Sequence, residues 1–133
     1  MGTDYGVTIL TMYSAELLDH FEHPRNAGEI AHPDVSVQLE NPACGDILKL
    51  TAKIANGRIQ EIRFLAKGCV AAMACGSALT ELVQGRTLEE ARSLRREEVV
   101  RAVGGLPAAS GHASHLAIDT LADLLQQEKN RSN

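Results

Sequence analysis

Three short stretches of the chain alternate apolar and polar residues, and they lie at 35–39, 48–54 and 59–65. A period of two residues is typical of strands that bury one face. Between the second and third stretches, Asn56 and Gly57 form a strong signal for a type I′ hairpin turn. The pattern therefore predicts three consecutive strands joined as an antiparallel meander.

Apolar residues recur at helical spacing on both sides of these strands. Upstream, Leu17 and Phe21 lie on one face of a predicted short helix, which begins after Ser14, a suitable N-cap, and stops at Pro24. Downstream, a 3.6-residue period predicts helices at 70–85, 88–94, 97–103 and 112–127. Small residues dominate the first of these, so it can lie close to the sheet.

The order of these elements sets the expected fold class. Strands in one block with most helices after them predict an α+β fold, in which helices pack mainly on one face of a three-stranded antiparallel sheet. We expect a single domain over 13–127, a flexible amino-terminal arm at 1–12 and a frayed tail at 128–133.

Composition excludes several classes of protein. The chain has 133 residues, of which 44% are hydrophobic and 23% charged, so one globular domain is expected. No apolar run approaches the ~18 residues of a membrane span. A net charge of −4 and only 3% aromatic residues argue against nucleic-acid binding. Asp4 and the short apolar stretch after it do not fit a secretory leader, so a cytoplasmic location is expected.

Side chains that bind metals fall at the ends of predicted elements. Cys44 and Asp46 lie at the turn that enters the second strand, Cys69 follows the third strand, and His112 begins the last helix. Two thiolates, an imidazole and a carboxylate suit Zn²⁺, iron or a small iron-sulfur cluster. Spacing alone leaves two interpretations open, a shared metal site and scattered core thiols, because the chain has no pair of cysteines separated by two residues.

The remaining cysteine and histidines have simpler interpretations. We expect the helix dipole and Lys67 to favour a thiolate at Cys69, although a buried thiol at a strand end is also open. Cys75 falls on the apolar face of its helix and is expected in the core. His20 is expected to complement the end of the first helix, and His115 to be a second ligand or an exposed partner of a carboxylate one turn away.

Four spaced motifs together resemble a known family. They are Tyr13-Ser14-x₄-Asp19-His20-Phe21-x₂-Pro24-Arg25-Asn26-x-Gly28, Asn41-Pro42-Ala43-Cys44-Gly45-Asp46, Phe64-x₃-Gly68-Cys69 and Leu106-Pro107-x₄-His112. The family that shares them is the iron-sulfur cluster assembly scaffolds of the IscU/NifU amino-terminal type. The similarity runs in order from about Met12 to Gln127, which is nearly the whole chain.

The resemblance implies a scaffold or carrier rather than an enzyme. A cysteine desulfurase would supply sulfur, iron would be added, and a labile [2Fe-2S] cluster would pass to acceptor apoproteins. By correspondence with the family motifs, Cys44, Asp46, Cys69 and His112 are the cluster and metal ligands. The resemblance is compatible with a monomer or a weak homodimer.

Two positions depart from the family pattern. Ala113 stands where the family has its third cysteine, a cluster ligand and the expected acceptor of persulfide sulfur, so the site is atypical. The turn from Leu106 to Ser110 differs from the family's Leu-Pro-Pro-Val-Lys sequence, which weakens the expectation that a dedicated Hsp70-type chaperone docks there.

Two alternative functions remain open at this point. The first is a divergent paralogue that binds Zn²⁺ through Cys44, Asp46, Cys69 and His112 and acts as a sulfur acceptor or a regulator. The second is an enzyme that uses Cys69 and His112 as a thiolate-imidazolium pair for thiol or acyl transfer.

Overall fold

The central sheet contains three strands in chain order, as the alternating pattern predicts. The computed structural model describes residues 12–132. Its strands are β1 Val35–Asn41, β2 Asp46–Ala55 and β3 Arg58–Lys67, and both neighbouring pairs are antiparallel. At the turn between β2 and β3, Asn56 and Gly57 have φ angles of 55° and 71°. Positive φ at both central residues is what a type I′ turn requires, so the predicted hairpin is confirmed.

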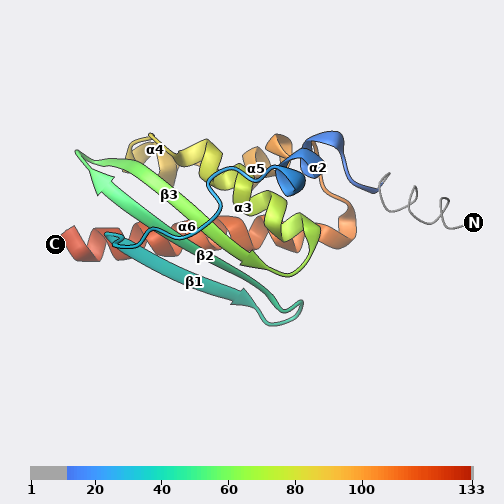
Figure 1. Cartoon of the computed structure of the whole chain (residues 1–133), viewed down its shortest axis with the longest axis horizontal. Coiled ribbons are helices and arrows are strands. Elements are labelled where there is room, and N and C mark those ends of the chain that lie inside the picture. Colours follow the sequence, from blue (N-terminus) through green and yellow to red (C-terminus); the bar gives the residue numbers. More distant parts are fainter. Residues whose placement is uncertain (1–11, 133) are drawn as a thin grey trace, which may run out of the picture.

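The helices follow one another in the predicted order, and they lie on one side of the sheet (Figure 1). They are α2 Ala15–Glu22, α3 Val70–Val83, α4 Leu88–Arg92, α5 Arg96–Ala102, the short 3₁₀ helix Ala108–Ser110, and α6 His112–Ser132. Ser14 caps α2, since its side chain accepts a hydrogen bond from the backbone nitrogen of Leu17. Figure 1 shows α3 and α6 packed behind the sheet, with α4 and α5 beyond them.

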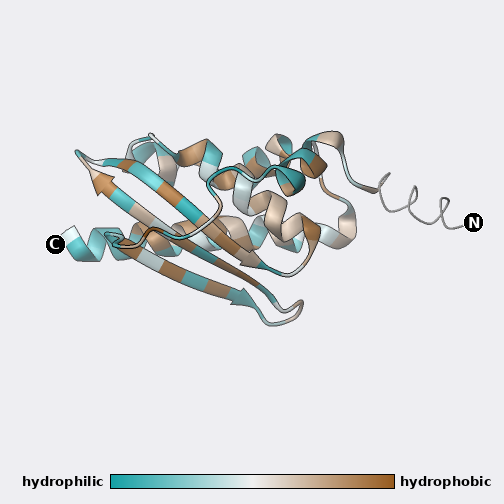
Figure 2. Ribbon diagram, viewed as in Figure 1, coloured by the Kyte–Doolittle hydropathy of each residue, from teal (hydrophilic) through white to brown (hydrophobic). Residues whose placement is uncertain are grey.

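The hydrophobic core lies between the sheet and the two long helices. Alternate residues of the strands face it, and Leu50 and Ile62 have no exposed surface. Leu79 on α3 and Leu124 on α6 are also fully buried and meet the strand residues from the other side. The alternation of apolar and polar residues along the strands is visible in Figure 2. The α+β fold expected from the sequence is therefore confirmed.

The opposite face of the sheet is covered in part by the segment between α2 and β1, which crosses in front of the strands in Figure 1. The backbone nitrogen of Ile30 donates to Thr51 Oγ1, and Gly28 donates to the carbonyl of Phe64. Thr51 is only 1% exposed as a result. This cover is a loop, so the helices themselves remain on one side of the sheet.

The carboxyl-terminal tail differs from the expectation. Residues 128–132, predicted to fray, continue α6 to Ser132. Glu128 is 3% exposed, and both of its carboxylate oxygens accept hydrogen bonds from the Arg131 guanidinium. This local pair keeps a polar residue buried at the end of the helix.

The predicted arm at 1–12 lies outside the described residues except for Met12. Over residues 12–132, no helix has the length and apolarity needed to span a membrane.

Candidate metal centre

Three of the four predicted ligands meet at one end of the sheet. Asp46, Cys69 and His112 each present a donor atom, and these three atoms all lie within 4.8 Å of one another. His112 Nε2 is 3.0 Å from Asp46 Oδ2, and Cys69 Sγ is 3.6 Å from the same oxygen. The sulfur and the imidazole nitrogen are 4.0 Å apart. A carboxylate thus lies between a thiol and an imidazole.

Each of these residues begins a secondary-structure element or immediately precedes one. Asp46 is the first residue of β2, Cys69 is the N-cap of α3, and His112 is the first residue of α6. The three segments are far apart in sequence, and they converge because β2, α3 and α6 have neighbouring ends at this side of the core. The side chains are accordingly placed by the fold rather than by a local motif.

Gly68 makes the close approach of Asp46 and Cys69 possible. Its φ is +134°, and a Cβ built on it would lie 2.0 Å from Asp46 Oδ1. That same oxygen accepts a hydrogen bond of 3.2 Å from the backbone nitrogen of Cys69. A larger residue at position 68 would therefore collide with the carboxylate. The sequence contained this signal as the Gly68-Cys69 pair, but its role as space for Asp46 was not predicted.

The electrostatics of Cys69 differ from the expectation. Burial is the main cause that raises the pKa of Cys69 above its ordinary value, and the negative charge of Asp46 raises it further. The backbone N–H of Ala72, at the start of α3, donates to the sulfur and acts in the opposite direction. Burial and the carboxylate outweigh the helix terminus, so the predicted stabilisation of a free thiolate is wrong.

Cys44 does not join the group of three. It is exposed, in the four-residue turn between β1 and β2, and the clustered donors among residues 12–132 are those of Asp46, Cys69 and His112. The turn is held by hydrogen bonds from the backbone nitrogens of Cys44 and Gly45 to the carbonyl of Asn41. Cys44 is two residues from Asp46 in sequence, and its thiol is accessible from solvent.

Cys75 and Ala113 both belong to the core. Cys75 has no exposed surface, which confirms its predicted place, and burial raises the pKa of its thiol to about 12. Ala113 is 1% exposed, next to His112 on α6. Neither residue is among the donor atoms of the site.

Two histidines differ in their surroundings. His20 was expected to complement the end of α2, but it is only 6% exposed, and its Nδ1 is 2.8 Å from the hydroxyl of Ser77 on α3. Burial lowers the pKa of His20, which favours the neutral ring. Its side chain therefore connects α2 to α3. His20 does lie in the last turn of α2, as expected, but a neutral ring does not complement the helix dipole, so that part of the interpretation is wrong. His115 is exposed and lies outside the cluster of three donors.

The arrangement suits a metal or cluster better than a nucleophile. One sulfur, one imidazole nitrogen and one carboxylate oxygen are a donor set that iron and zinc both accept. In a catalytic triad the carboxylate binds the ring nitrogen that does not face the nucleophile. Here Asp46 lies against Nε2, the same nitrogen that is closest to Cys69.

The fold is a small α+β domain, and one end of its sheet carries three clustered donor atoms that could hold a metal ion. The NifU-like N terminal domain model matches residues 12–133, so the chain belongs to this family. Among curated relatives, "Iron-sulfur cluster assembly scaffold protein IscU 1" of Archaeoglobus fulgidus is 44% identical over 110 residues, which cover 83% of this chain and 72% of the relative. The protein of Escherichia coli named "Iron-sulfur cluster assembly scaffold protein IscU" is 35% identical over 123 residues, covering 90% of this chain and 95% of the relative.

Solved structures share the fold at lower sequence identity. One is described as a putative iron-sulfur cluster assembly scaffold protein for the SUF system from Fervidobacterium islandicum, with a TM-score of 0.74, 18% identity and coverage of 86% of this chain and 97% of that chain. The amino-terminal part of a NifU-like protein from Brucella abortus gives a TM-score of 0.73 at 19% identity, covering 90% and 95% of the two chains. At these identities the likeness concerns the fold.

Proposed function

We propose that this protein is a scaffold on which a labile iron-sulfur cluster is assembled and then transferred to acceptor apoproteins. The observation that supports this function is the convergence of Asp46, Cys69 and His112 from three elements within 4.8 Å. The curated relatives carry the name of such scaffolds. The cluster is cargo in this proposal, so the protein is a carrier and not an enzyme.

The proposed ligand set has four members. Asp46, Cys69 and His112 would form its inner part, and Cys44, which lies two residues before Asp46 in sequence, would add a second thiolate. A [2Fe-2S] cluster prefers thiolates, whereas a carboxylate oxygen is a harder donor that binds it less tightly. Two thiolates in place of three therefore favour a cluster that is held weakly and released readily.

The proposed partners follow from the accessibility of the thiols. A cysteine desulfurase supplies the sulfur, and Cys44 is the thiol that such a donor reaches first because it is exposed, whereas Cys75 is fully buried. The Cys44 thiolate would attack the outer sulfur of the donor's persulfide, take over that sulfur and release the donor's thiolate. Acceptor apoproteins would then remove the finished cluster from the same end of the sheet.

Anaerobic reconstitution with iron and sulfide tests this function. We expect visible charge-transfer absorption in the wild-type chain, loss of that absorption in Cys69→Ala, and its retention in the matched variant Cys75→Ala. Equal absorption in wild type and Cys69→Ala would overturn the proposed site.

The same donors suit Zn²⁺. The alternative function is therefore a zinc-binding paralogue that accepts sulfur or regulates a partner. The metal content of the purified protein distinguishes this alternative from the scaffold. Zinc that survives purification, combined with no absorption after reconstitution, would support the paralogue and contradict the scaffold.

A further inference from the structure

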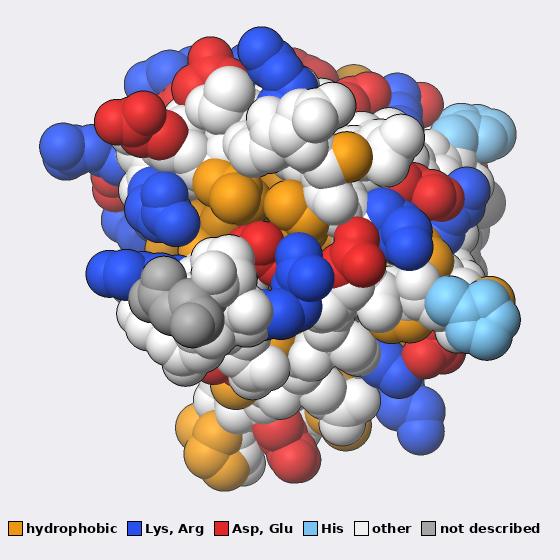
Figure 3. All heavy atoms as spheres, turned by 90° about the vertical axis from the view of Figure 1, so that its left-hand side faces the viewer, with side chains coloured by type: hydrophobic (Ala, Val, Ile, Leu, Met, Phe, Trp, Pro, Cys, Tyr) orange, Lys and Arg blue, Asp and Glu red, His pale blue; other side chains and the backbone are white. Residues whose placement is uncertain are grey.

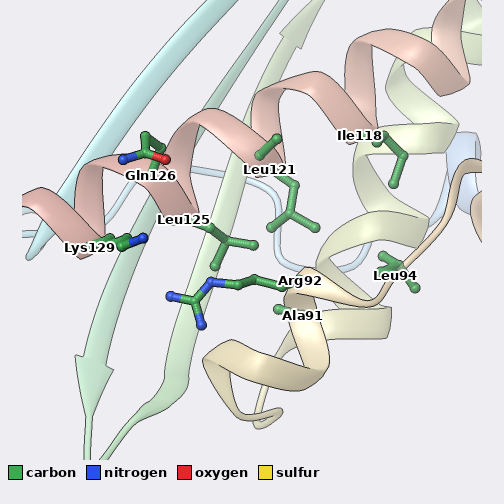
Figure 4. Close-up of a pocket in the computed structure, with 9 residues that line it drawn as sticks. Ala91, Arg92, Leu94, Ile118, Leu121, Leu125, Gln126 and Lys129 are labelled. Carbon is green, nitrogen blue, oxygen red and sulfur yellow. The ribbon is translucent and has the colours of Figure 1, made fainter.

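A groove far from the metal centre runs between α4 and the carboxyl-terminal half of α6. Its volume is about 320 Å³. Ala91, Leu121 and Leu125 form the floor, and each is at most 5% exposed. Leu94 and Ile118 lie at one end of the groove, as Figure 4 shows. The floor and this end of the groove are therefore apolar.

Two basic side chains mark the other end. Figure 4 shows Arg92 from α4 and Lys129 from α6 extending toward the same end of the groove, past Leu125. In the part of the chain that the structure describes, neither Arg92 nor Lys129 forms a salt bridge, and no acidic residue lines the groove. On this end of the molecule, Figure 3 shows hydrophobic side chains in a hollow with basic side chains beside them. An apolar floor that leads to two free cations is complementary to an apolar ligand with negative charge at one end.

The shape favours a peptide over a small molecule. Pockets for small ligands enclose most of the ligand surface. This groove is open, since Arg92, Ala122, Gln126 and Lys129 along its edges are all exposed. From Ile118 to Leu125 the apolar stripe follows α6 for about 10 Å, which equals about two turns of a second helix laid beside it. Amphipathic helices bind grooves of this kind through apolar residues spaced three and four apart.

We infer that the groove between α4 and α6 is a docking site for an amphipathic helix of a partner protein, whose acidic end meets Arg92 and Lys129. Leu121 lies about 14 Å along α6 from His112. The partner would therefore bind while the metal centre remains open to sulfur donors and acceptors. The inference does not depend on which metal or cluster the centre holds.

A pair of synthetic peptides tests this site on the full chain. The first is a helical peptide of about 15 residues with leucines at i, i+3 and i+7 and two glutamates at one end. Its twin has lysines in place of the glutamates. Amide shifts in the nuclear magnetic resonance spectrum of the ¹⁵N-labelled protein report binding, and we expect saturable shifts at α4 and residues 118–129 with the acidic peptide and much weaker shifts with the basic twin.

Variants then separate the groove from general charge effects. Arg92→Glu and Lys129→Glu are each expected to weaken binding of the acidic peptide by about fivefold, because each removes and reverses a charge at the end of the groove. Arg101→Glu, at an exposed arginine of α5 outside the groove, is the matched control and should leave binding unchanged. Equal binding of both peptides, equal loss in all three variants, shifts confined to the sheet, or no shifts at all would each overturn the inference.

Discussion

The carboxylate of Asp46 lies between the other two clustered donors, Cys69 and His112. It is 2% exposed, and it contacts both of the other clustered donors. A buried carboxylate that accepts hydrogen bonds from a backbone amide, a thiol and an imidazole is well satisfied before any metal arrives. A carboxylate oxygen is also the hardest of these donors toward iron. Substitution of Asp46 therefore tests whether this side chain promotes the loss of a bound cluster.

Asp46→Ala is expected to slow the loss of the reconstituted cluster several-fold, because a softer thiol from the buffer can take the position of the carboxylate. Decay of the visible absorption in the presence of a chelator measures this rate. Asp119→Ala, at an exposed carboxylate on α6, is the control and should decay like the wild type. Faster loss from Asp46→Ala than from the control would contradict the role assigned to the carboxylate.

The three thiols should react with iodoacetamide in the order Cys44, Cys69, Cys75. Cys44 is exposed, the pKa of Cys69 is raised by burial, and the pKa of Cys75 is about 12. A raised pKa leaves less thiolate at a given pH, so at pH 8 only about one Cys75 in ten thousand is ionised. Alkylation of Cys69 is expected to accelerate as the pH rises above 8, while Cys75 reacts only in the unfolded chain. Peptide mass spectrometry measures each rate, and early labelling of Cys75 in the folded protein would show that it is not in the core.

The junction between β3 and α3 brings Asp46 and Cys69 together at a single glycine, Gly68. Gly68→Ala would insert a Cβ at 2.0 Å from Asp46 Oδ1 and force a side chain into a φ of +134°. We expect a loss of about 2–3 kcal/mol in the free energy of unfolding, together with loss of metal binding. Urea denaturation and metal titration measure the two effects.

Gly57→Ala is the matched control for that substitution. Its φ is +71°, but nothing lies within 4 Å of the added Cβ. The control therefore reports the conformational cost alone, about 1 kcal/mol, with metal binding retained. Equal effects of the two substitutions would show that the contact with Asp46 is unimportant.

Local periodicity explains why so many elements were predictable. The strands alternate because one face is buried, and Ser14 and Asn56-Gly57 act through hydrogen bonds and φ angles within a few residues. The convergence of Asp46, Cys69 and His112 was expected from element ends because these residues begin or precede elements that share a core.

Features that depend on distant contacts were not predictable in this way. The hydrophobic pattern ends the last helix near Gln127, whereas α6 continues to Ser132. The difference arises because Glu128 is buried and paired with Arg131, and this burial depends on how the helix packs. His20 was misinterpreted since its partner, Ser77, is 57 positions away in sequence. The pKa of Cys69 was misjudged because the cost of its burial and the charge of Asp46 exceed the effect of the helix terminus. Each of these outcomes needs three-dimensional packing that a hydrophobic pattern does not contain.

For the whole molecule, a bound metal should act as a crosslink between the sheet, α3 and α6. A ligand that binds only the folded state stabilises it by about 2.7 kcal/mol at a hundredfold excess over Kd. Addition of Zn²⁺ is therefore expected to raise Tm by about 5–10 °C, with reversal by a chelator. Differential scanning calorimetry measures the shift. Cys75→Ala should retain the full increase and Cys69→Ala should lose most of it, whereas an equal increase in both variants would place the metal elsewhere.

The three clustered donors come together only while β2, α3 and α6 are all docked. Detachment of the first turn of α6 alone removes His112 and breaks the donor set, while the sheet and the rest of the core remain folded. Such partial opening costs only a fraction of the free energy of global unfolding. An acceptor protein thus has no need to unfold the scaffold or to outbind all of its ligands together. In the proposed scaffold, capture of this open form would be sufficient, and the local stability of a few residues before and after His112 would then set the rate of delivery.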